Sequence, residues 1–343
     1  MKAFVTGSTG LLGNNLVRTL LRDGHEVVGL TRSAEKFETM LGDTNALPVV
    51  GDIQSIDAFA GHLDGCDVFF HTAAYFREYY GKGDHLTHLE AINVTATLEL
   101  MAAADKRGVP VFVHTSSAGT IGERPDGAPG DEDTPASERD LRNLYFKSKV
   151  EGDAKIRAYE SSNGMRVVQI LPGWMWGPGD AGPTGAGQIV FDFLDGKFPA
   201  VPEGGTSLVD ARDVAEAMVR AMDQPNGERF IVGGAYHSLR EVVDGLAAAT
   251  GRPSPKGNLP AWLAIGFAHI SEAWASLTGG RAAANLEGVR TMARKHTVTS
   301  AKAEKALGAR FRPLDETIHD VVQWYADHKM LPEGTEVKRT AHA

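Results

Sequence analysis

The feature that most constrains the fold is a glycine-rich stretch near the start of the chain, Gly7-Ser-Thr-Gly-Leu-Leu-Gly13. The apolar run Lys2–Thr6 precedes it and is too short to form a helix by itself. From Leu11 to Leu21, leucines recur at the spacing of one helix face, and Gly24 stands where such a helix would end. The glycines therefore lie at a turn that leads from a strand into a helix.

A turn of this kind can hold the pyrophosphate of a dinucleotide. Gly7 permits the tight turn, Gly10 lets the backbone approach the phosphates, and Gly13 lets the helix pack close to the strand. The start of the helix presents free N–H groups and the positive end of its dipole to the phosphates. The residues expected to contact a cofactor here are Gly7, Thr9, Gly10, Leu11, Leu12 and Gly13.

Apolar runs alternate with helical patterns through the first half of the chain. The expected strands are Glu26–Thr31, Leu47–Val50, Val68–Thr72, Val109–Thr115 and Met165–Leu171. The longest helical patterns between them are Leu86–Arg107 and Arg142–Ser162. Unbroken apolar runs separated by helices are typical of a parallel sheet covered on both faces. We therefore predict an α/β protein with a Rossmann-type doubly wound parallel sheet.

The organisation changes at the Gly- and Pro-rich segment Gly173–Gly187, after which helical patterns dominate. These later helices are expected at Ala211–Asp223, Ser238–Thr250, Ala261–Leu277 and Leu314–His328. We predict a dinucleotide-binding domain over 1–172, to which 206–232 returns. A smaller, mostly helical substrate-binding region then covers 173–205 and 233–330, and 331–343 is a polar tail.

Composition excludes several other classes of protein. The chain has 343 residues, 42% of them hydrophobic, which suits a large core and roughly two domains. A net charge of −9 with mixed acids and bases disfavours nucleic-acid binding. Cys66 is the one cysteine, so no internal disulfide forms and a reducing setting is expected. The histidines lack metal-ligand spacing, so we expect structural roles for them and no metal.

Targeting and membrane signals are not apparent in the sequence. The first residues lead directly into the glycine turn, so no signal peptide is expected. The longest apolar region, Leu259–Leu277, contains His269 and Glu272 and is too polar to span a membrane. We therefore expect a cytoplasmic protein that does not bind membranes, and leave a homodimer open.

Tyr145 and Lys149 lie four residues apart within a predicted helix, so their side chains share one face about one turn apart. A tyrosine with a pKa near 10 does not release its proton readily at pH 7. A neighbouring ammonium favours the phenolate and lowers that pKa. The pair is therefore suited to proton transfer, although the same spacing also occurs on ordinary exposed helices.

Three hydroxyl residues, Thr115, Ser116 and Ser117, stand at the end of the expected strand that begins at Val109. They stand at its carboxyl end, where open α/β sheets bind ligands. Side chains alternate in an extended segment, so Thr115 and Ser117 would share a direction. Ser117 is our candidate for the catalytic hydroxyl, and Ser116 as a backbone-capping hydroxyl is the competing interpretation.

Together these motifs resemble the short-chain dehydrogenase/reductase superfamily, in particular its extended branch. The glycines are spaced as in that branch, and Ser117, Tyr145 and Lys149 match its active-site pattern. Further matching stretches are His71-Thr-Ala-Ala74, Asn93-Val94, Leu171-Pro-Gly173 and Leu208-Val-Asp-Ala-Arg-Asp213. The resemblance covers residues 1–330. Within the branch, Thr115–Ile121 is most similar to dihydroflavonol 4-reductases and bacterial aldehyde or ketone reductases.

The resemblance implies a role for each matching residue. Ser117 would hydrogen-bond a substrate carbonyl, Tyr145 would act as general acid, and Lys149 would tune Tyr145 and bind the nicotinamide ribose. Asn93 would hold backbone or water near the tyrosine. The other cofactor contacts that it implies are Asp52 and Ile53 at the adenine, and Ala73, Ala74, Pro172 and Gly173 near the sheet.

The end of the second strand bears on the choice of cofactor. NAD enzymes usually place an acid there to hold the ribose 2′-hydroxyl. Here Glu26–Thr31 is followed by Arg32 and Ser33, and no acid occurs before Glu35. The Arg32 guanidinium and the Ser33 hydroxyl could bind a 2′-phosphate, and a solvated arginine at a strand end is the competing interpretation. We expect NADP(H), with NAD(H) as the alternative.

Aromatic residues mark the expected substrate side. Tyr75 and Tyr79 follow the fourth strand, and Trp174 and Trp176 follow the sixth. They suggest a flat or apolar substrate, or equally well they pack between the domains. We predict NADPH-dependent reduction of an aldehyde or ketone, aromatic or alicyclic, to an alcohol.

Two other functions remain as alternatives. One is a nucleotide-sugar epimerase or dehydratase with tightly bound NAD. Its diphosphate would need cations, and only Arg290, Arg294 and Lys295 offer them, on an expected helix whose charged face is more simply solvated. The other is a sensor that binds NADP without turnover, which has no need of a general acid.

Overall fold

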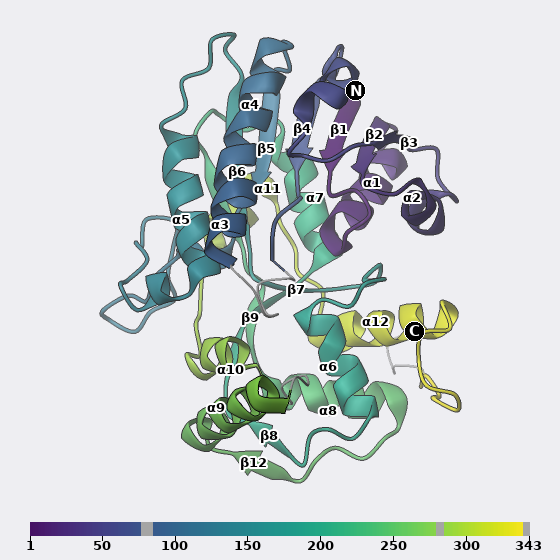
Figure 1. Ribbon diagram of the computed structural model, residues 1–343, viewed down its shortest axis with the longest axis vertical. Helices are drawn as coiled ribbons and strands as arrows, with labels where there is room; N and C mark the ends of the chain where they lie inside the picture. The colour runs from purple at the N-terminus through teal and green to yellow at the C-terminus, as the bar shows by residue number, and fades with distance from the viewer. Residues whose placement is uncertain (77–84, 279–284, 339–343) are drawn as a thin grey trace.

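The computed structural model describes residues 1–76, 85–278 and 285–338. Figure 1 shows a larger part that holds the purple and blue N-terminal half of the chain, and a smaller part below it. We call the larger part the sheet lobe and the smaller part the helical lobe. The chain passes between the two parts more than once.

The sheet lobe is built on seven parallel strands in the order β10-β6-β5-β4-β1-β2-β3. Their bounds are β1 Lys2–Thr6, β2 Glu26–Thr31, β3 Leu47–Val50, β4 Val68–His71, β5 Val111–Thr115, β6 Arg166–Pro172 and β10 Arg229–Val232. The order reverses between β1 and β4, which creates the switch point where such sheets bind ligands. The predicted fold class is confirmed.

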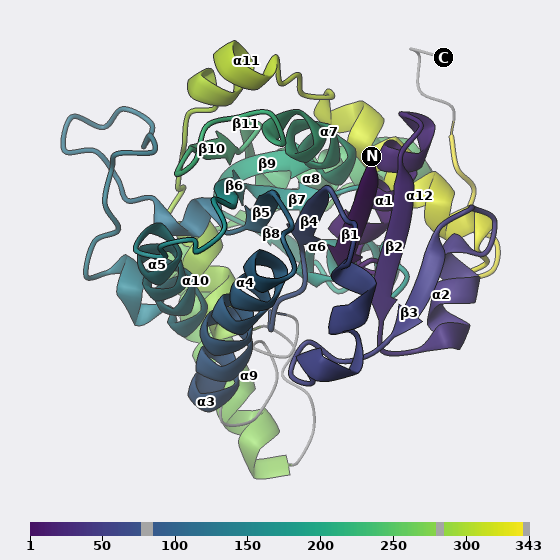
Figure 2. The same ribbon diagram turned by 90° about the horizontal axis from the view of Figure 1, so that it is seen from above.

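Helices cover both faces of this sheet (Figure 2). One face holds α1 (Leu11–Arg22), α2 (Ala34–Leu41), α7 (Ala211–Ala221) and α11 (Ala301–Leu307), and the other holds α4 (Thr97–Lys106) and α5 (Leu144–Arg157). The strand pleat explains the two cores, because Ala3 and Val5 point into the first and Phe4 into the second.

The long helix expected over Leu86–Arg107 is a composite. It consists of α3 (His85–Leu89), a π-helical segment Glu90–Ala96, and α4. π-Helical turns inside α-helices occur frequently at functional sites. Asn93 lies in this segment, so the irregular turn places it beside α5.

The helical lobe contains two small sheets. One joins β7 (Trp174–Trp176), β9 (Gly205–Asp210) and β11 (Ala235–Ser238), and the other joins β8 (Ala200–Pro202) and β12 (Gly257–Leu259). Its helices are α6 (Gly185–Leu194), α8 (Leu239–Thr250), α9 (Ala261–Thr278), α10 (Leu286–Ala293) and α12 (Leu314–Asp327). A buried core holds α6, α8 and α12 together through Val190, Leu246 and Ile318.

The segment 206–232 is divided between the two lobes. β9 pairs in the small sheet, whereas α7 packs on α1 and β10 forms the edge of the large sheet. α11 also contacts α7 and β10, although it lies late in the chain. The two lobes are therefore interleaved in sequence rather than consecutive.

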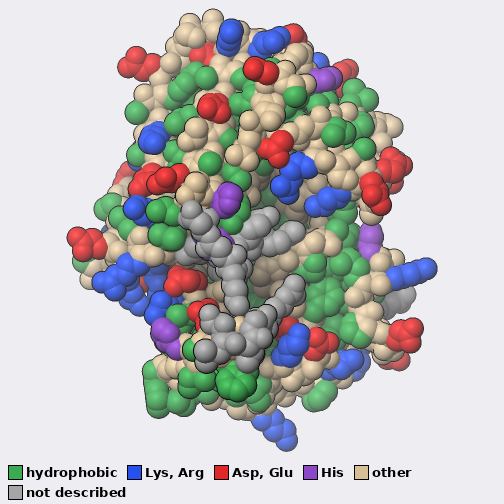
Figure 3. Space-filling view, viewed as in Figure 1, with side chains coloured by type: hydrophobic (Ala, Val, Ile, Leu, Met, Phe, Trp, Pro, Cys, Tyr) green, Lys and Arg blue, Asp and Glu red, His purple; other side chains and the backbone are tan. Residues whose placement is uncertain are grey.

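Helix α9 turns its larger side chains outward. Ala264 and Ala268 are buried, whereas Trp262, Phe267 and Ile270 are largely exposed. Figure 3 shows hydrophobic side chains gathered at the lower left, where Figure 1 places this helix. No helix within the described ranges is both long and apolar enough to cross a membrane.

Candidate active site

The glycine turn has the geometry of a phosphate-binding loop. Gly7 has φ +67°, and a Cβ there would lie 2.7 Å from Thr72 Oγ1. A Cβ on Gly13 would collide with the Gly7 carbonyl oxygen. Gly10 is the N-cap of α1, no side chain caps this terminus, and its first turn carries no acid. The N–H groups of Leu11 and Leu12 and the positive dipole end thus suit a pyrophosphate.

The residues expected at the adenosine end follow β2 and β3. Arg32 is exposed directly after β2. The Ser33 hydroxyl caps α2 by accepting a hydrogen bond from Lys36 N at 3.1 Å, and it can still donate its own proton. Asp52 Oδ1 accepts from Gln54 N at 2.9 Å, which orders the turn after β3. These residues share the carboxyl edge of the sheet with the glycine turn.

The loops after β4 and β6 approach the same edge. Thr72 Oγ1 donates to the Thr6 carbonyl at 2.7 Å and ties the β4 loop to β1, just before Ala73 and Ala74. After Pro172, Gly173 is enclosed, because a Cβ there would lie 2.5 Å from the Gly233 oxygen. Gly173 is therefore required by packing between the lobes, whether or not it also contacts a cofactor.

The three hydroxyl residues after β5 point to different neighbours. Thr115 is buried, with Oγ1 3.9 Å from Met218 Sδ on α7. Ser116 is also buried and donates to Asp153 Oδ2 at 2.7 Å. Ser117 is partly exposed, and its Oγ accepts from Gly119 N at 3.1 Å. Only Ser117 of the three therefore combines a locally anchored hydroxyl with access to a ligand.

Tyr145 and Lys149 lie on the first half of α5 and are almost fully buried. Lys149 Nζ donates to the Thr115 carbonyl at 3.0 Å, so it reaches the end of β5 directly before the serines. Burial lowers the pKa of Lys149 to about 8, and the charge of Asp153 opposes that lowering. The lysine thus remains mainly an ammonium at neutral pH.

An apolar cluster surrounds the Tyr145 ring. The Phe76 ring centroid lies 4.8 Å away and that of Phe146 5.8 Å away. Leu89 and Tyr75 belong to the same cluster. A Cβ on Gly119 would collide with the Phe146 ring, so the Ser117 loop lies directly against the start of α5. The fold thus brings Ser117, Tyr145 and Lys149 to one edge of the sheet.

Asn93 links the substrate-side loop to the catalytic helix. Its Oδ1 accepts from Tyr75 N at 2.7 Å, and its Nδ2 donates to the Tyr75 carbonyl at 3.0 Å. The same Nδ2 also donates to Ser148 Oγ at 3.3 Å. Ser148 lies between Tyr145 and Lys149 on α5, and its Oγ donates to the Tyr145 carbonyl at 2.8 Å. Asn93 therefore connects the Tyr75 backbone to the helix that carries the site.

The aromatic residues expected on the substrate side are divided. Tyr75 is partly buried, and its hydroxyl is 3.0 Å from His85 Nδ1. Trp174 is half-buried and meets Trp176 edge-on at 5.1 Å. Trp176 itself is 1% exposed within the helical-lobe core, the position of a packing residue. Tyr79 lies outside the described residues.

Two buried histidines close to Lys149 pack and hydrogen-bond as structural residues. The rings of His71 and His114 stack with centroids 5.5 Å apart. His71 bonds to Thr6 Oγ1 at 2.8 Å and Thr97 Oγ1 at 3.0 Å. Burial, with the Lys149 charge, lowers the pKa of His71 to about 3 and that of His114 well below its usual value. Both are therefore neutral at pH 7.

Metal-ligand geometry is not found at these histidines. Across residues 1–76, 85–278 and 285–338, no group of three or more His, Cys, Asp or Glu side chains could hold a metal ion together.

Asp153 is a residue that our reading of the sequence missed. Besides Ser116, its carboxylate accepts from Gln169 Nε2 at 3.1 Å, and Arg229 Nη2 lies 3.5 Å away. Burial raises its pKa, and the Ser116 bond, Arg229 and Lys149 oppose that rise. The available signal was its spacing, because Asp153 stands one further helical turn after Tyr145 and Lys149.

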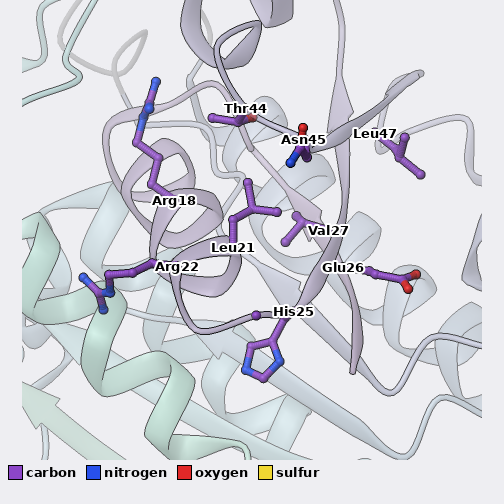
Figure 4. Close-up of a pocket in the computed structure, with 10 residues that line it drawn as sticks. Arg18, Leu21, Arg22, His25, Glu26, Val27, Thr44, Asn45 and Leu47 are labelled. Atoms are coloured by element: carbon purple, nitrogen blue, oxygen red, sulfur yellow. The ribbon is translucent and has the colours of Figure 1, made fainter.

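A separate hollow of about 610 Å³ lies at the amino ends of β2 and β3 (Figure 4). Its wall includes Arg18 and Arg22, which pair with Asp43 and Asp23. Parallel sheets bind ligands at their carboxyl edge, and this hollow is at the opposite edge. We therefore do not assign it to the candidate site.

Comparison with known proteins adds independent findings. The sequence model of the NAD dependent epimerase/dehydratase family matches residues 3–233. A protein of Synechocystis sp. with the provisional name dihydroflavonol 4-reductase is 32% identical, covering 95% of this chain and 94% of that protein. Sterol demethylase protein B of Methylococcus capsulatus is 28% identical, covering 96% and 100%. The crystal structure of gox2253 matches with a TM-score of 0.80 and 30% identity, covering 96% of this chain and 99% of that one.

Proposed function

The chain belongs to the NAD-dependent epimerase/dehydratase family, and from that premise we propose that it uses NADPH to reduce a carbonyl compound to an alcohol. It is an NAD(P)-dependent oxidoreductase of the short-chain dehydrogenase/reductase type. One observation carries the proposal: a buried lysine, held at the Thr115 carbonyl, stands one helical turn from Tyr145 and next to the Ser117 loop. That arrangement serves proton transfer to a substrate oxygen.

The proposed chemistry assigns each side chain a task. The nicotinamide cofactor, when bound, supplies the hydride. Tyr145 donates its phenolic proton to the substrate oxygen, on which negative charge develops. Ser117 accepts from Gly119 N, which leaves its own hydrogen free to bond the same oxygen. The Lys149 ammonium stabilises the phenolate left on Tyr145, and we expect it to bind the ribose hydroxyls as well.

The surroundings of Tyr145 favour an apolar substrate. The rings of Phe76 and Phe146 and the partly buried Tyr75 flank the phenol. Trp174 provides a further aromatic surface on the loop after β6. Dihydroflavonols and sterols, which appear in the names of two relatives, are ring compounds. We therefore propose an aromatic or alicyclic aldehyde or ketone.

The second candidate is a nucleotide-sugar epimerase or dehydratase with tightly bound NAD, which the family description favours. Two of the three cations that we considered for its diphosphate, the arginines, are already engaged in ion pairs. Arg294 is 12% exposed at its side chain and pairs with the buried Asp140, so it does not lie on a solvated face as expected. Arg290 is exposed and pairs with Glu287. These pairs favour the reductase over the epimerase.

The proposed function also carries expectations about partners, cellular location and the cysteine. We expect a small-molecule substrate, no nucleic-acid partner and a cytoplasmic location, and a homodimer remains open. The one cysteine, Cys66, is buried, and burial raises the pKa of its thiol, which suits an inert packing residue.

The test is to follow NADPH oxidation with aromatic aldehydes, aromatic and alicyclic ketones, and nucleotide sugars. We expect turnover with the first two classes and none with the sugars. Burying one large apolar ring contributes roughly 1.5–3 kcal/mol, so Trp174→Ala should raise KM more for bulky ketones than for small aldehydes. Trp262→Ala removes an exposed tryptophan of α9 and serves as the control. Efficient epimerisation of a nucleotide sugar without added cofactor would overturn the proposal in favour of the second candidate.

A further inference from the structure

Three polar residues follow one another at four-residue intervals along a single face of α5: Tyr145, Lys149 and Asp153. The proposed mechanism uses the first two and leaves the third unexplained. Asp153 is almost fully buried, at 1% exposure. A carboxylate is costly to bury unless hydrogen bonds and opposite charges satisfy it, so its partners indicate its role.

We propose that Asp153 is a positioning residue for the Ser-Tyr-Lys site: its carboxylate anchors the Ser116–Ser117 loop to α5 and supplies the counter-charge for Lys149. The inference deepens the proposed function and rests on it for its kinetic readout. It requires no contact between Asp153 and substrate or cofactor.

The first part of the role concerns the serine loop. Ser116 donates to Asp153 Oδ2 at 2.7 Å, and the next residue along the chain is Ser117. Gln169 Nε2, on β6, donates to the other carboxylate oxygen at 3.1 Å. The carboxylate thus joins the end of β5, the strand β6 and the catalytic helix. Loss of this junction would let Ser117 shift against Tyr145, and a misplacement of about 1 Å can cost roughly 10²-fold in rate.

The second part concerns the charge of Lys149. Besides Tyr145, one turn earlier on α5, the titratable groups that act on Lys149 or feel its charge are His71, His114 and Asp153. Both histidines are neutral at pH 7, because burial lowers their pKa values. Among the described residues, Asp153 is thus the group whose negative charge opposes desolvation of the ammonium.

Cationic groups around Asp153 oppose the rise in its pKa that burial causes. Arg229 from β10 lies 3.5 Å away, and Arg157 and Lys149 face it from its own helix. Arg229 also donates to the Glu132 carbonyl at 3.0 Å, and Glu132 and Asp133 act on the same guanidinium. The negative charge is therefore balanced on both sides, by Arg229 and by Lys149.

Removal of the Asp153 charge should shift the pH dependence of the reaction. Without the Asp153 charge, the pKa of Lys149 falls further below its usual value, so the ammonium is lost nearer to neutral pH. The Tyr145 phenolate then loses its stabilising cation. The alkaline limb of the kcat profile should accordingly move to lower pH, by roughly one unit, since a nearby opposite charge shifts a pKa by about 1–3 units.

The experiment compares the full-length protein with four variants. Asp153→Asn keeps the shape and removes the charge, Asp153→Glu restores the charge, and Ser116→Ala removes only the bond to the serine loop. Asp105→Asn is the matched control, because Asp105 is a buried acid bonded to Ser161 and Ser162, beyond the C-terminal end of α5 and not beside Lys149.

We expect Asp153→Asn to lower kcat by roughly ten- to hundredfold and to move the alkaline limb of the kcat–pH profile to lower pH. The Kd for NADPH should stay nearly unchanged. Asp153→Glu should restore the position of the limb. Ser116→Ala should lower kcat by a few-fold with the limb unmoved. Asp105→Asn should lower only the melting temperature.

A second readout does not depend on turnover. In protein labelled with ¹³Cε-lysine, the Lys149 resonance, identified by its absence in Lys149→Met, reports the ionisation of the ammonium directly. The pH midpoint of its titration should be lower in Asp153→Asn than in the wild type. In Ser116→Ala and Asp105→Asn that midpoint should be unchanged. If no carbonyl compound is reduced by the wild type, the proposed function fails, while this titration still decides the role of Asp153.

Two results would overturn the inference. One is an unchanged Lys149 midpoint in Asp153→Asn. The other is an Asp153→Asn variant that loses only as much melting temperature and activity as Asp105→Asn, with its pH profile unmoved. Should Asp153→Asn fail to fold, Asp153→Glu and Ser116→Ala carry the test. A limb displaced by Ser116→Ala, or left displaced by Asp153→Glu, would then count against the assignment.

Discussion

At the scale of the residue, the phenol of Tyr145 carries the proposed proton transfer. Tyr145→Phe keeps the ring in its cluster with Phe76 and Phe146 and removes only the donor. Loss of a general acid typically costs about 10²- to 10⁴-fold in rate, so kcat should fall by that amount. NADPH affinity, measured by fluorescence titration, should barely change. A variant that retains more than about a tenth of wild-type turnover would remove Tyr145 from this role.

The two neighbouring serines give a second test at this scale. Ser117→Ala removes the donor proposed for the substrate oxygen, and loss of one such donor costs about 10²- to 10³-fold in kcat. Ser116→Ala loses only the bond to Asp153 and should cost far less. Steady-state kinetics on both variants checks the order. The reverse order would move the catalytic assignment by one residue.

Part of the site can be predicted from spacing alone. Tyr145 and Lys149 follow from helix periodicity, and the glycine turn follows from its place between a strand and a helix. Asp153 was equally visible by spacing, but its role depends on partners from β5, β6 and β10, far apart in sequence. Trp176 shows the opposite limit, because its type and position suggested a substrate wall and core packing equally well, and its burial shows a core residue.

At the scale of the element, the end of β2 carries the choice between cofactors. Arg32 is exposed there, and Ser33 caps the following helix. A charge-assisted hydrogen bond contributes about 1.5–3 kcal/mol, so Arg32→Ala should reduce the preference for NADPH over NADH roughly ten- to hundredfold. Kinetics with both cofactors measures this ratio, and Arg22→Ala, an exposed arginine elsewhere, is the control. Equal weakening toward both cofactors would make Arg32 structural.

The elements themselves were mostly predictable. β2 and β3 coincide with the expected ranges, because each is a short apolar run closed by turn residues. The π-helical segment around Asn93 could not be predicted, since its i→i+5 bonds have no local sequence pattern, and Asn93 within it binds the backbone of Tyr75, which lies outside the helix. Local periodicity reports which face is buried, but it does not report partners brought together by tertiary structure.

At the scale of the whole molecule, the lobes are joined by ion pairs that sequence order conceals. Arg212, at the start of α7, bonds the fully buried Asp210 carboxylate at 2.7 Å and Asp320 of α12 at 2.6 Å. α7 packs against α1 in the sheet lobe, whereas α12 belongs to the helical lobe. The division of 206–232 between the lobes places this arginine at their junction. Such a junction follows from the path of the chain and has no local sequence pattern.

The stability of the whole molecule should depend on pH through its buried histidines. The folded protein holds the pKa of His71 at about 3 and that of His114 well below its usual value, whereas both return to about 6.5 on unfolding. Above pH 6.5 neither state binds these protons, so they leave stability unchanged. As pH falls below 6.5, only the unfolded chain takes them up, and the folded state loses stability until its own low pKa is reached.

The free energy of unfolding should therefore fall between pH 6.5 and 4.5, by up to about 1.4 kcal/mol per pH unit for each histidine. His114→Phe keeps a ring against His71 and removes one titrating group, whose Nδ1 has no hydrogen-bond partner among the residues that the structure describes. Urea unfolding at several pH values in this window should show a shallower slope for His114→Phe than for wild type. His62→Phe, at an exposed position, should leave the slope unchanged. Equal slopes in His114→Phe and wild type would show that His114 also takes up its proton in the folded state, against its burial beside the Lys149 ammonium.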